Sequence, residues 1–298
     1  MEVTPSAERF RKACDEARER GGAVGFVPTM GALHQGHASL LKRARSETEF
    51  VALSIFVNPL QFGSGEDLRA YPRTLEKDRA VAESLRTDLL FCPSEEEMYR
   101  SPPQVTVDPG PLGDRFEGAS RPRHFRGVLT VVAKLFNLVG AARSYFGEKD
   151  AQQLALVRRM VADLDFPMTV VGCATVREVD GLALSSRNAY LSPDERRTAP
   201  VLFDALSTAA ALLRAGERRA NVLKAEMARR IGAEPQARVE YVALVDEDSW
   251  NDVETISGPA RALVAARIGP ARLIDNLVLP WEQRWSVHNT EQAQKEGR

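Results

Sequence analysis

Short apolar runs alternate with segments of helical spacing through the first 175 residues, and this alternation restricts the chain to few folds. The apolar runs cover residues 23–28, 50–57, 88–92, 144–146 and 168–173, and the helical segments cover 6–20, 38–46, 74–85, 128–139 and 151–164. Strands that alternate with helices predict a parallel, doubly wound α/β sheet with helices on both faces. Ligands of such sheets bind at the carboxyl ends of the strands. The residues that follow each predicted strand are therefore the first candidates for a binding site.

The pattern changes near residue 175, where the regular alternation ends. The segments expected beyond this point are a hairpin over 175–190, helices over 193–214 and 221–231, and strands over 239–245, 262–268 and 273–279. The hairpin is expected to turn at Asp180-Gly181, a pair that favours tight turns. We therefore expect a Rossmann-like domain over 1–175, a smaller α+β domain over 176–281, and a polar, disordered tail over 282–298.

Composition excludes several classes of function. The 298 residues carry a net charge of −1, which argues against a large nucleic-acid surface, since such surfaces need clustered Lys and Arg. Three scattered cysteines, Cys14, Cys92 and Cys173, fit a reducing cytoplasm rather than a disulfide framework. No apolar run approaches the roughly 20 residues that span a bilayer, and residues 1–5 do not resemble a signal peptide. We expect a cytoplasmic protein with neither membrane nor nucleic-acid partners.

Two of the four histidines lie three residues apart in His34-Gln35-Gly36-His37, between a predicted strand and a predicted helix. A strand, a glycine-containing turn and a helix N-terminus form a common phosphate site, because backbone N–H groups and the helix dipole favour an anion there. Imidazoles at this point can also donate hydrogen bonds to phosphate oxygens. A surface pair and a zinc site are the alternatives, and zinc needs more ligands than this spacing supplies. Asn58 and Lys149 also follow predicted strands and should lie near the pair.

Six sequence blocks carry a resemblance to a known family. They are residues 28–37 (PTMGALHQGH), 56–62 (FVNPLQF), 71–74 (YPRT), 124–130 (HFRGVLT), 146–154 (FGEKDAQQL) and 184–188 (LSSRN). Together, and in this order, they resemble the pantothenate synthetase (pantoate–β-alanine ligase) family, part of the nucleotidyltransferase superfamily with HIGH-type motifs. The resemblance extends from about residue 5 to residue 281.

This resemblance implies an ATP-dependent ligase with a two-step reaction. (R)-Pantoate and ATP, with Mg²⁺, would form pantoyl adenylate and pyrophosphate, and the β-alanine amine would then displace AMP to give pantothenate. The resemblance also implies a homodimer, small molecules as the binding partners, and a place in coenzyme A biosynthesis. The catalytic residues that it implies are His34, His37, Lys149 and Arg187. An arginine suits phosphate because its planar group donates bidentately, and closure of a second domain that carries Arg187 would complete the site.

The same matching assigns binding roles. The implied ATP-binding residues are Met30, Gly31, Ala32, Leu33, His34, Gln35, Gly36, His37, Gly147, Glu148, Lys149, Asp150, Val176, Leu184, Ser185, Ser186 and Arg187. Pantoate would contact Gln61, Gln153 and Met30, with support from Asn58, and β-alanine would contact Gln61. Pantoate has a gem-dimethyl carbon, so its pocket should be partly apolar. No metal site made by protein side chains is expected.

Two further residues receive a more ordinary interpretation. Asp78 lies in a charged stretch and is predicted to be a solvated helix residue rather than a magnesium ligand, and His124 has no assigned role although it lies in a matching block.

Another nucleotidyltransferase and a catalytically inactive nucleotide-binding protein are the rival hypotheses. The near-neutral charge argues against a tRNA substrate, and the presence of all four implied catalytic residues argues against loss of activity.

Overall fold

The first part of the chain forms one parallel sheet. The computed structural model describes residues 1–63, 66 and 68–280. Six strands pair in the order β1-β4-β3-β2-β5-β6, and every pair is parallel. They are β1 (Glu2–Thr4), β2 (Val24–Thr29), β3 (Phe50–Ile55), β4 (Leu89–Phe91), β5 (Ala142–Gly147) and β6 (Met168–Cys173). The predicted doubly wound sheet is confirmed, and the structure adds the edge strand β1, which the sequence pattern did not indicate.

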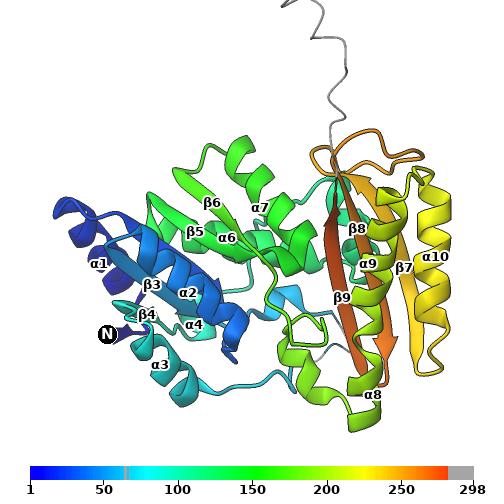
Figure 1. Cartoon of the computed structure of the whole chain (residues 1–298). Coiled ribbons are helices and arrows are strands. Elements are labelled where there is room, and N and C mark those ends of the chain that lie inside the picture. Colours follow the sequence, from blue (N-terminus) through cyan, green and yellow to red (C-terminus); the bar gives the residue numbers. More distant parts are fainter. Residues whose placement is uncertain (64–65, 67, 281–298) are drawn as a thin grey trace, which may run out of the picture.

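Helices cover both faces of this sheet (Figure 1). One face is covered by α1 (Ala7–Glu19), α6 (His124–Val139) and α7 (Ala151–Asp163), and the other by α2 (Gln35–Glu47) and α3 (Leu75–Ser84). Successive side chains of a strand point to opposite faces, so Phe26 of β2 packs in the core with α1 and α6, whereas Val27 packs in the core with α2. The connections contain α4 (Glu95–Met98), α5 (Glu117–Ser120) and three 3₁₀ turns, η1 (Pro59–Gln61), η2 (Pro111–Asp114) and η3 (Glu148–Asp150).

Strands β2 and β5 lie next to each other, and the chain leaves them in opposite directions across the sheet. From β2 it proceeds to β3 on one side, and from β5 to β6 on the other. A crevice forms at such a switch point, beyond the carboxyl ends of the two strands. The segment after Thr29 and the segment after Gly147 therefore border one space, although they are far apart in the sequence.

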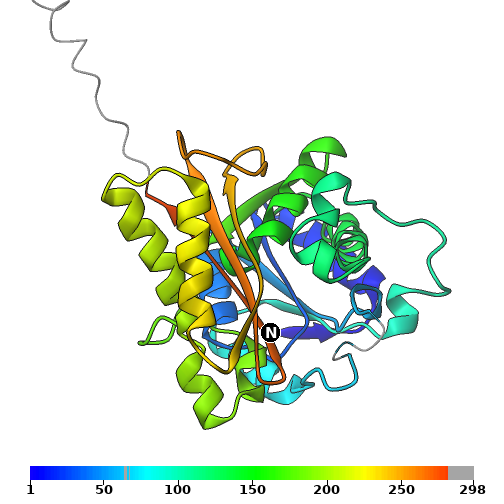
Figure 2. The ribbon, with the colours of Figure 1, turned by 90° about the vertical axis from the view of Figure 1, so that its right-hand side faces the viewer.

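The rest of the chain builds a second, antiparallel sheet in the order β7-β8-β9. Its strands are β7 (Ala237–Asp246), β8 (Ala260–Ile268) and β9 (Ala271–Leu279), and its helices are α8 (Pro193–Thr198), α9 (Val201–Arg214) and α10 (Ala220–Gly232), after the 3₁₀ turn η4 (Ser186–Tyr190). Helices α9 and α10 cover one face, and the edge strand β9 faces the first sheet and its helices (Figures 1 and 2).

Two predictions in this second part need correction. The single helix expected over 193–214 is wrong: α8 ends before Pro200 and α9 begins after it, because proline has no N–H to donate to the preceding turn. The hairpin expected over 175–190 is reduced to one antiparallel bridge between Arg177 and Ala183, followed by η4. The predicted tail over 282–298 lies outside the described residues.

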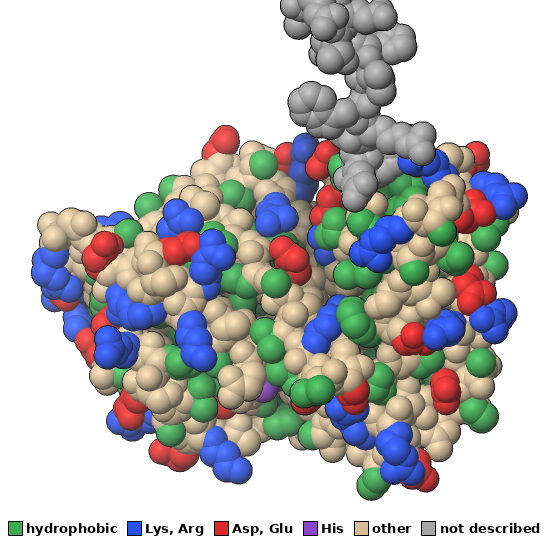
Figure 3. All heavy atoms as spheres, viewed as in Figure 1, with side chains coloured by type: hydrophobic (Ala, Val, Ile, Leu, Met, Phe, Trp, Pro, Cys, Tyr) green, Lys and Arg blue, Asp and Glu red, His purple; other side chains and the backbone are tan. Residues whose placement is uncertain are grey.

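Charges of both signs are interspersed over the face shown in Figure 3. None of the helices in the described part of the chain is both long enough and apolar enough to cross a bilayer.

Candidate active site

Two connected cavities lie at the carboxyl end of the parallel sheet. The inner pocket, of about 240 Å³, lies between the ends of β2 and β5, and the outer cleft, of about 1140 Å³, lies between the first part of the chain and β9. Both are lined by Phe62, Arg121, His124, Lys149, Asp150, Gln153, Ser185 and Arg187. The two cavities therefore adjoin each other along these residues.

Most of the residues implied by the six blocks meet at the inner pocket. Those that line it are Met30, His34, Gly36, His37, Gln61, Gly147, Lys149, Asp150, Gln153, Val176, Leu184, Ser185, Ser186 and Arg187. Gly31, Ala32, Leu33, Gln35, Glu148 and Asn58 line neither cavity. Their predicted contacts with ATP or pantoate stay predictions.

The two histidines also cap helix α2. His34 Nδ1 accepts a hydrogen bond from the Gly36 N–H at 3.1 Å, and His37 Nδ1 accepts one from the His34 N–H at 3.3 Å. This reciprocal arrangement is that of a capping box, with imidazoles in place of the usual Ser and Glu. Because Nδ1 is an acceptor in both rings, the proton of each neutral ring is on Nε2.

Both imidazoles are neutral at pH 7. Burial, together with the neighbouring His34 ring, lowers the pKa of His37 to about 3. Burial and the nearby Lys149 also lower the pKa of His34. The ring centroids lie 4.1 Å apart, so a charge on either ring would disfavour a charge on the other. The pair therefore offers two neutral N–H donors rather than two cations.

Lys149 supplies a positive charge across the pocket from the histidines. It lies in η3, directly after β5, and its side chain is 20% exposed, with Nζ 3.6 Å from Asp150 Oδ1. The serines of the LSSRN block and Arg187 reach the same pocket from η4, where Ser185 Oγ accepts a hydrogen bond from the Arg187 N–H at 3.3 Å. Neutral donors and cations thus surround one space from three separate segments.

Asn58 fixes the orientation of Gln61. Asn58 is 1% exposed, and its Nδ2 donates to Gln61 Oε1 and to the Gly127 carbonyl, both at 3.1 Å. The Tyr99 hydroxyl donates to Asn58 Oδ1 at 2.9 Å. The Gln61 amide nitrogen is thereby turned toward the pocket, where it lies 3.0 Å from Met30 Sδ.

A face of helix α6 gives the inner pocket an apolar wall. Val128, Val131, Val132 and Leu135 line the pocket, and their spacing places them on one side of the helix. The spacing over 128–139 predicts a helix, and the structure shows that the apolar side of this helix is the wall of the pocket. The N-terminal half of α6 packs closely against η1. A Cβ added to Gly127 of this helix would lie only 2.2 Å from the Leu60 carbonyl oxygen.

Asp78 is buried and holds the loop that precedes His34. It is 2% exposed, and its carboxylate accepts hydrogen bonds from the Ala32 N–H at 2.9 Å and the Leu33 N–H at 2.7 Å. The prediction of a solvated helix residue is therefore wrong. The loop needs this support because Gly31 and Ala32 both have positive φ angles, which a residue with a Cβ rarely adopts.

His124 connects Gln61 to the outer cleft. Its Nε2 lies 3.0 Å from an Arg121 guanidinium nitrogen, which can only donate, so Nε2 is the acceptor and Nδ1 donates to the Gln61 carbonyl at 2.9 Å. Burial and the Arg121 charge lower the pKa of His124 to about 4, which keeps the ring neutral. Arg121 also pairs with Glu66 at 2.8 Å.

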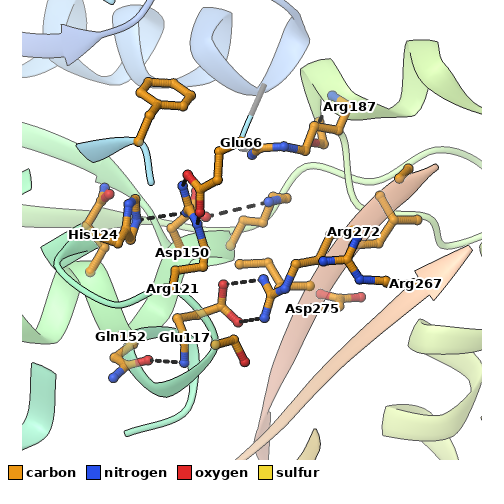
Figure 4. A pocket seen from close by; sticks show the side chains of 18 of the residues that line it. Glu66, Glu117, Arg121, His124, Asp150, Gln152, Arg187, Arg267, Arg272 and Asp275 are labelled. Carbon is orange, nitrogen blue, oxygen red and sulfur yellow. Dashed lines mark hydrogen bonds and ion pairs between the residues drawn. The ribbon is translucent and has the colours of Figure 1, made fainter. Parts of the chain in front are cut away.

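A buried ion pair joins the two parts of the chain at the wall of the outer cleft (Figure 4). Arg272 of β9 donates two hydrogen bonds to Glu117, at 2.5 and 2.7 Å, and the Tyr241 hydroxyl donates to Glu117 at 2.8 Å. The Glu117 N–H in turn donates to Gln152 Oε1 at 3.0 Å. Sequence reasoning missed Glu117, Arg121 and Arg272, since they lie outside the strand ends and no local pattern distinguishes them from surface charges.

The donor set around the pocket contains nitrogen and amide groups rather than a metal cage. Among the described residues, no group of three or more His, Cys, Asp or Glu side chains is arranged to hold a metal ion. The three cysteines are free thiols, and Cys14 packs in a different part of the core from Cys92 and Cys173.

Comparisons with known proteins agree with the resemblance found in the six blocks. Residues 2–278 match the sequence model of the family described as Pantoate-beta-alanine ligase. The chain is 52% identical to the pantothenate synthetase of Roseiflexus castenholzii over 279 residues, which are 94% of this chain and 99% of the relative. It is 53% identical to that of Heliobacterium modesticaldum over 265 residues, 89% and 94% of the two chains.

Solved structures show the same similarity in three dimensions. The crystal structure of pantothenate synthetase from Thermus thermophilus has a TM-score of 0.87 and 49% identity, and the match covers 94% of this chain and 99% of that one. The ligase from Francisella tularensis, described as complexed with Beta-gamma ATP and Beta-alanine, has a TM-score of 0.77 and 33% identity, with 95% and 99% covered.

Proposed function

Since the chain belongs to the pantoate–β-alanine ligase family, we propose that it condenses (R)-pantoate with β-alanine at the expense of ATP. The reaction would pass through pantoyl adenylate and release pyrophosphate and then AMP. The observation that carries this proposal is the inner pocket, where two neutral imidazoles, Lys149, Arg187 and two glutamines surround one space. The nucleotide and the amine in the Francisella relative support ATP and β-alanine as ligands here.

In the first step, a pantoate carboxylate oxygen would bond to the α-phosphorus of ATP while the bond to the bridging oxygen breaks and pyrophosphate leaves. The protein must hold the two reactants in line and stabilise the charge on the phosphate oxygens. We assign this work to the Nε2–H groups of His34 and His37 and to the Lys149 and Arg187 cations. Neutral imidazoles suit this role because they donate hydrogen bonds to the phosphate oxygens without the energetic cost of burying two further charges.

Pantoate would occupy the part of the inner pocket next to α6. The Val128 to Leu135 face is apolar and suits the gem-dimethyl carbon, whereas the Gln61 and Gln153 amides can donate to and accept from its oxygens. Gln61 is held in place before the ligand arrives, because Asn58 and His124 bind its side chain and backbone. A rigid acceptor–donor pair of this kind loses little entropy on binding.

In the second step, the β-alanine amine would reach the acyl carbon through the outer cleft. The nitrogen forms a bond to that carbon, the bond to the adenylate oxygen breaks, and the nitrogen loses a proton as AMP leaves. The outer cleft is wide and shares Arg121, Lys149 and Gln153 with the inner pocket, so the second substrate can arrive while the adenylate stays bound. The predicted contact of β-alanine with Gln61 fits this route.

The remaining expectations belong to the same proposal. We propose that residues 1–175 bind the nucleotide and pantoate, and that 176–281 act as a lid domain that brings Arg187 to the phosphates. ATP would enter as its Mg²⁺ complex, with the ion held mainly by phosphate and water oxygens. A homodimer and a cytoplasmic location follow from the family resemblance and the cysteine content, and size measurement in solution tests the former.

The test uses the purified chain with ATP, Mg²⁺, pantoate and β-alanine, and measures AMP and pantothenate. Adenylate formation is tested by omitting β-alanine and adding hydroxylamine, which should trap the pantoyl group as its hydroxamate. Pantoate-dependent pyrophosphate release without β-alanine supports the two-step route. AMP formation that does not depend on pantoate would contradict the proposal.

A further inference from the structure

Asn276 reaches from the second sheet to the backbone of the turn that carries Lys149. It lies in β9 and is 5% exposed, and its Nδ2 donates to the carbonyls of Glu148 and Lys149, both at 2.9 Å. Strand β9 is the edge strand that faces the parallel sheet (Figure 1). Arg272, four residues earlier on the same face of β9, makes the buried pair with Glu117. The face of β9 that holds Arg272 and Asn276 is therefore attached to the first part of the chain at two points.

The orientation of the Asn276 amide is determined by its other partners. Its Oδ1 accepts a hydrogen bond from an Arg261 guanidinium nitrogen, and Arg261, which is 6% exposed, pairs with Glu247 at 2.6 Å. An arginine nitrogen can only donate, so the oxygen of the amide faces Arg261 and the nitrogen faces the turn. Both N–H groups of Nδ2 are then used by the two carbonyls.

The neighbouring residue keeps the strand in register at this point. Asp275 accepts two hydrogen bonds from Arg177, at 2.6 and 2.9 Å, and one from the Asn276 N–H at 2.8 Å. Asp275 and Asn276 are both buried, although successive residues of a strand point to opposite faces. Side-chain hydrogen bonds therefore fix β9 on both of its faces at this point. They also fix the position of Asn276 relative to η3.

We propose that Asn276 is a positioning residue for Lys149: by holding the Glu148 and Lys149 carbonyls, it keeps the Lys149 ammonium aimed into the inner pocket. This inference rests on the proposed function, because it assigns Asn276 to the step that Lys149 serves. A displacement of about 1 Å in a reacting group can cost 100-fold in rate, so the backbone of a three-residue turn needs such a restraint. The second sheet then contributes to the first chemical step without touching substrate.

Two variants remove the donors in different ways. Asn276→Leu removes the amide, and Asn276→Asp keeps the shape and the acceptor for Arg261 but cannot donate to the carbonyls. Both should lower kcat of pantoate-dependent pyrophosphate release about 10- to 100-fold. The KM for pantoate should change by less than roughly twofold, because a group that acts only on the transition state leaves substrate binding intact. A fall in Asn276→Asp alone would indicate an effect of charge and overturn the proposal.

A control separates positioning from loss of stability. Leu223→Ala removes a fully buried side chain of α10, on the face of the second sheet away from η3, and should destabilise the protein without lowering kcat. If Leu223→Ala lowers kcat as much as Asn276→Leu, the role of Asn276 is merely structural.

A double-mutant cycle tests whether the effect passes through Lys149. In the Lys149→Ala background, Asn276→Leu should lower kcat by less than roughly threefold, because residues that act through one another are not additive. Multiplicative effects would overturn the proposal.

A second readout is independent of the reaction. Hydrogen exchange of residues 147–154 should be faster in Asn276→Leu than in the wild type and unchanged in Leu223→Ala. Unchanged exchange in Asn276→Leu would overturn the positioning role of Asn276, whatever the activity of the protein. Inactivity of the wild-type protein with pantoate would contradict the proposed function instead.

Discussion

His37 Nδ1 accepts a hydrogen bond from the His34 backbone N–H at 3.3 Å, so the residue proposed to assist catalysis also closes the N-terminus of helix α2. The two roles use different atoms of one ring. Nδ1 satisfies the helix, and Nε2 carries the proton that can be donated to a phosphate oxygen. Burial lowers the pKa of His37 to about 3, so the ring is neutral at pH 7, and the hydrogen bond accepted by Nδ1 fixes the tautomer.

Substitution can separate these two roles. An Asn side chain places its oxygen near the position of Nδ1, so His37→Asn should keep the cap and lose the pocket donor. We expect kcat to fall about 100- to 1000-fold with little change in the free energy of unfolding. His37→Ala should lose the cap as well, at a further cost of about 0.5–2 kcal/mol in stability. Steady-state kinetics and urea unfolding measure the two effects, and a fully active His37→Asn enzyme would contradict the assignment.

Lys149→Ala should remove one preorganised donor from the first step. Loss of such a group typically costs about 3 kcal/mol of transition-state stabilisation, which corresponds to roughly 100-fold in kcat. Lys42→Ala, which changes an exposed lysine of α2, is the matched control and should leave kcat unchanged. Pantoate-dependent pyrophosphate release is the measurement, and near-normal turnover in Lys149→Ala would mean that this lysine is misassigned.

Asp78→Asn should weaken the loop that leads to His34. The carboxylate accepts one hydrogen bond from each of two N–H groups, with a different oxygen for each. An amide has only one oxygen, so one of these half-buried N–H groups loses its partner. We expect a loss of about 1–3 kcal/mol in the free energy of unfolding, with a fall in kcat because the loop precedes the two histidines that we propose to be catalytic. Glu76→Gln, at an exposed position of the same helix, should change stability by less than about 0.5 kcal/mol. Equal stability of the two variants would argue against this role of Asp78.

His124 should make the folded state sensitive to acid. Its pKa is about 4 when folded, below the usual value of 6.5, so the unfolded chain binds a proton before the folded protein does. The stability it contributes is complete above pH 6.5 and is lost as the pH falls toward 4. Between pH 7 and pH 5 this loss is about 2 kcal/mol. His124→Gln should show a correspondingly smaller loss in urea unfolding at the two pH values, and an identical loss in both proteins would refute the explanation.

The fold class and most of the candidate site could be predicted from local patterns. The alternation of buried runs and helical spacing predicted the parallel sheet, since a fully buried strand reads as a continuous apolar run. That sheet explains why His34 and Lys149 meet: each follows a strand, and β2 and β5 are neighbours at the switch point. Helix α9 shows where such patterns fail, because its apolar spacing continues across Pro200 and conceals the break.

Contacts between distant segments could not be predicted in this way. Asp78 has the sequence neighbours of a surface residue, and only the fold places it under the Ala32 and Leu33 N–H groups. Asn276 stands beside Asp275 in a strand whose only other polar residue is Arg272, a pattern that could have indicated a buried polar pair. Its partners in η3 lie more than a hundred residues away in the sequence, so no periodicity could have identified them.

The sequence by itself determined most of the helices and strands, which strand ends carry reactive side chains, and which family the six blocks resemble. The tertiary structure decided which of those side chains are neutral and which have buried hydrogen-bond partners. It also decided how the second sheet is hydrogen-bonded to the turn that carries Lys149. The physical reason is that hydrophobic periodicity is a local property of the chain. Burial, tautomer and hydrogen-bond partner depend instead on groups that only folding brings together.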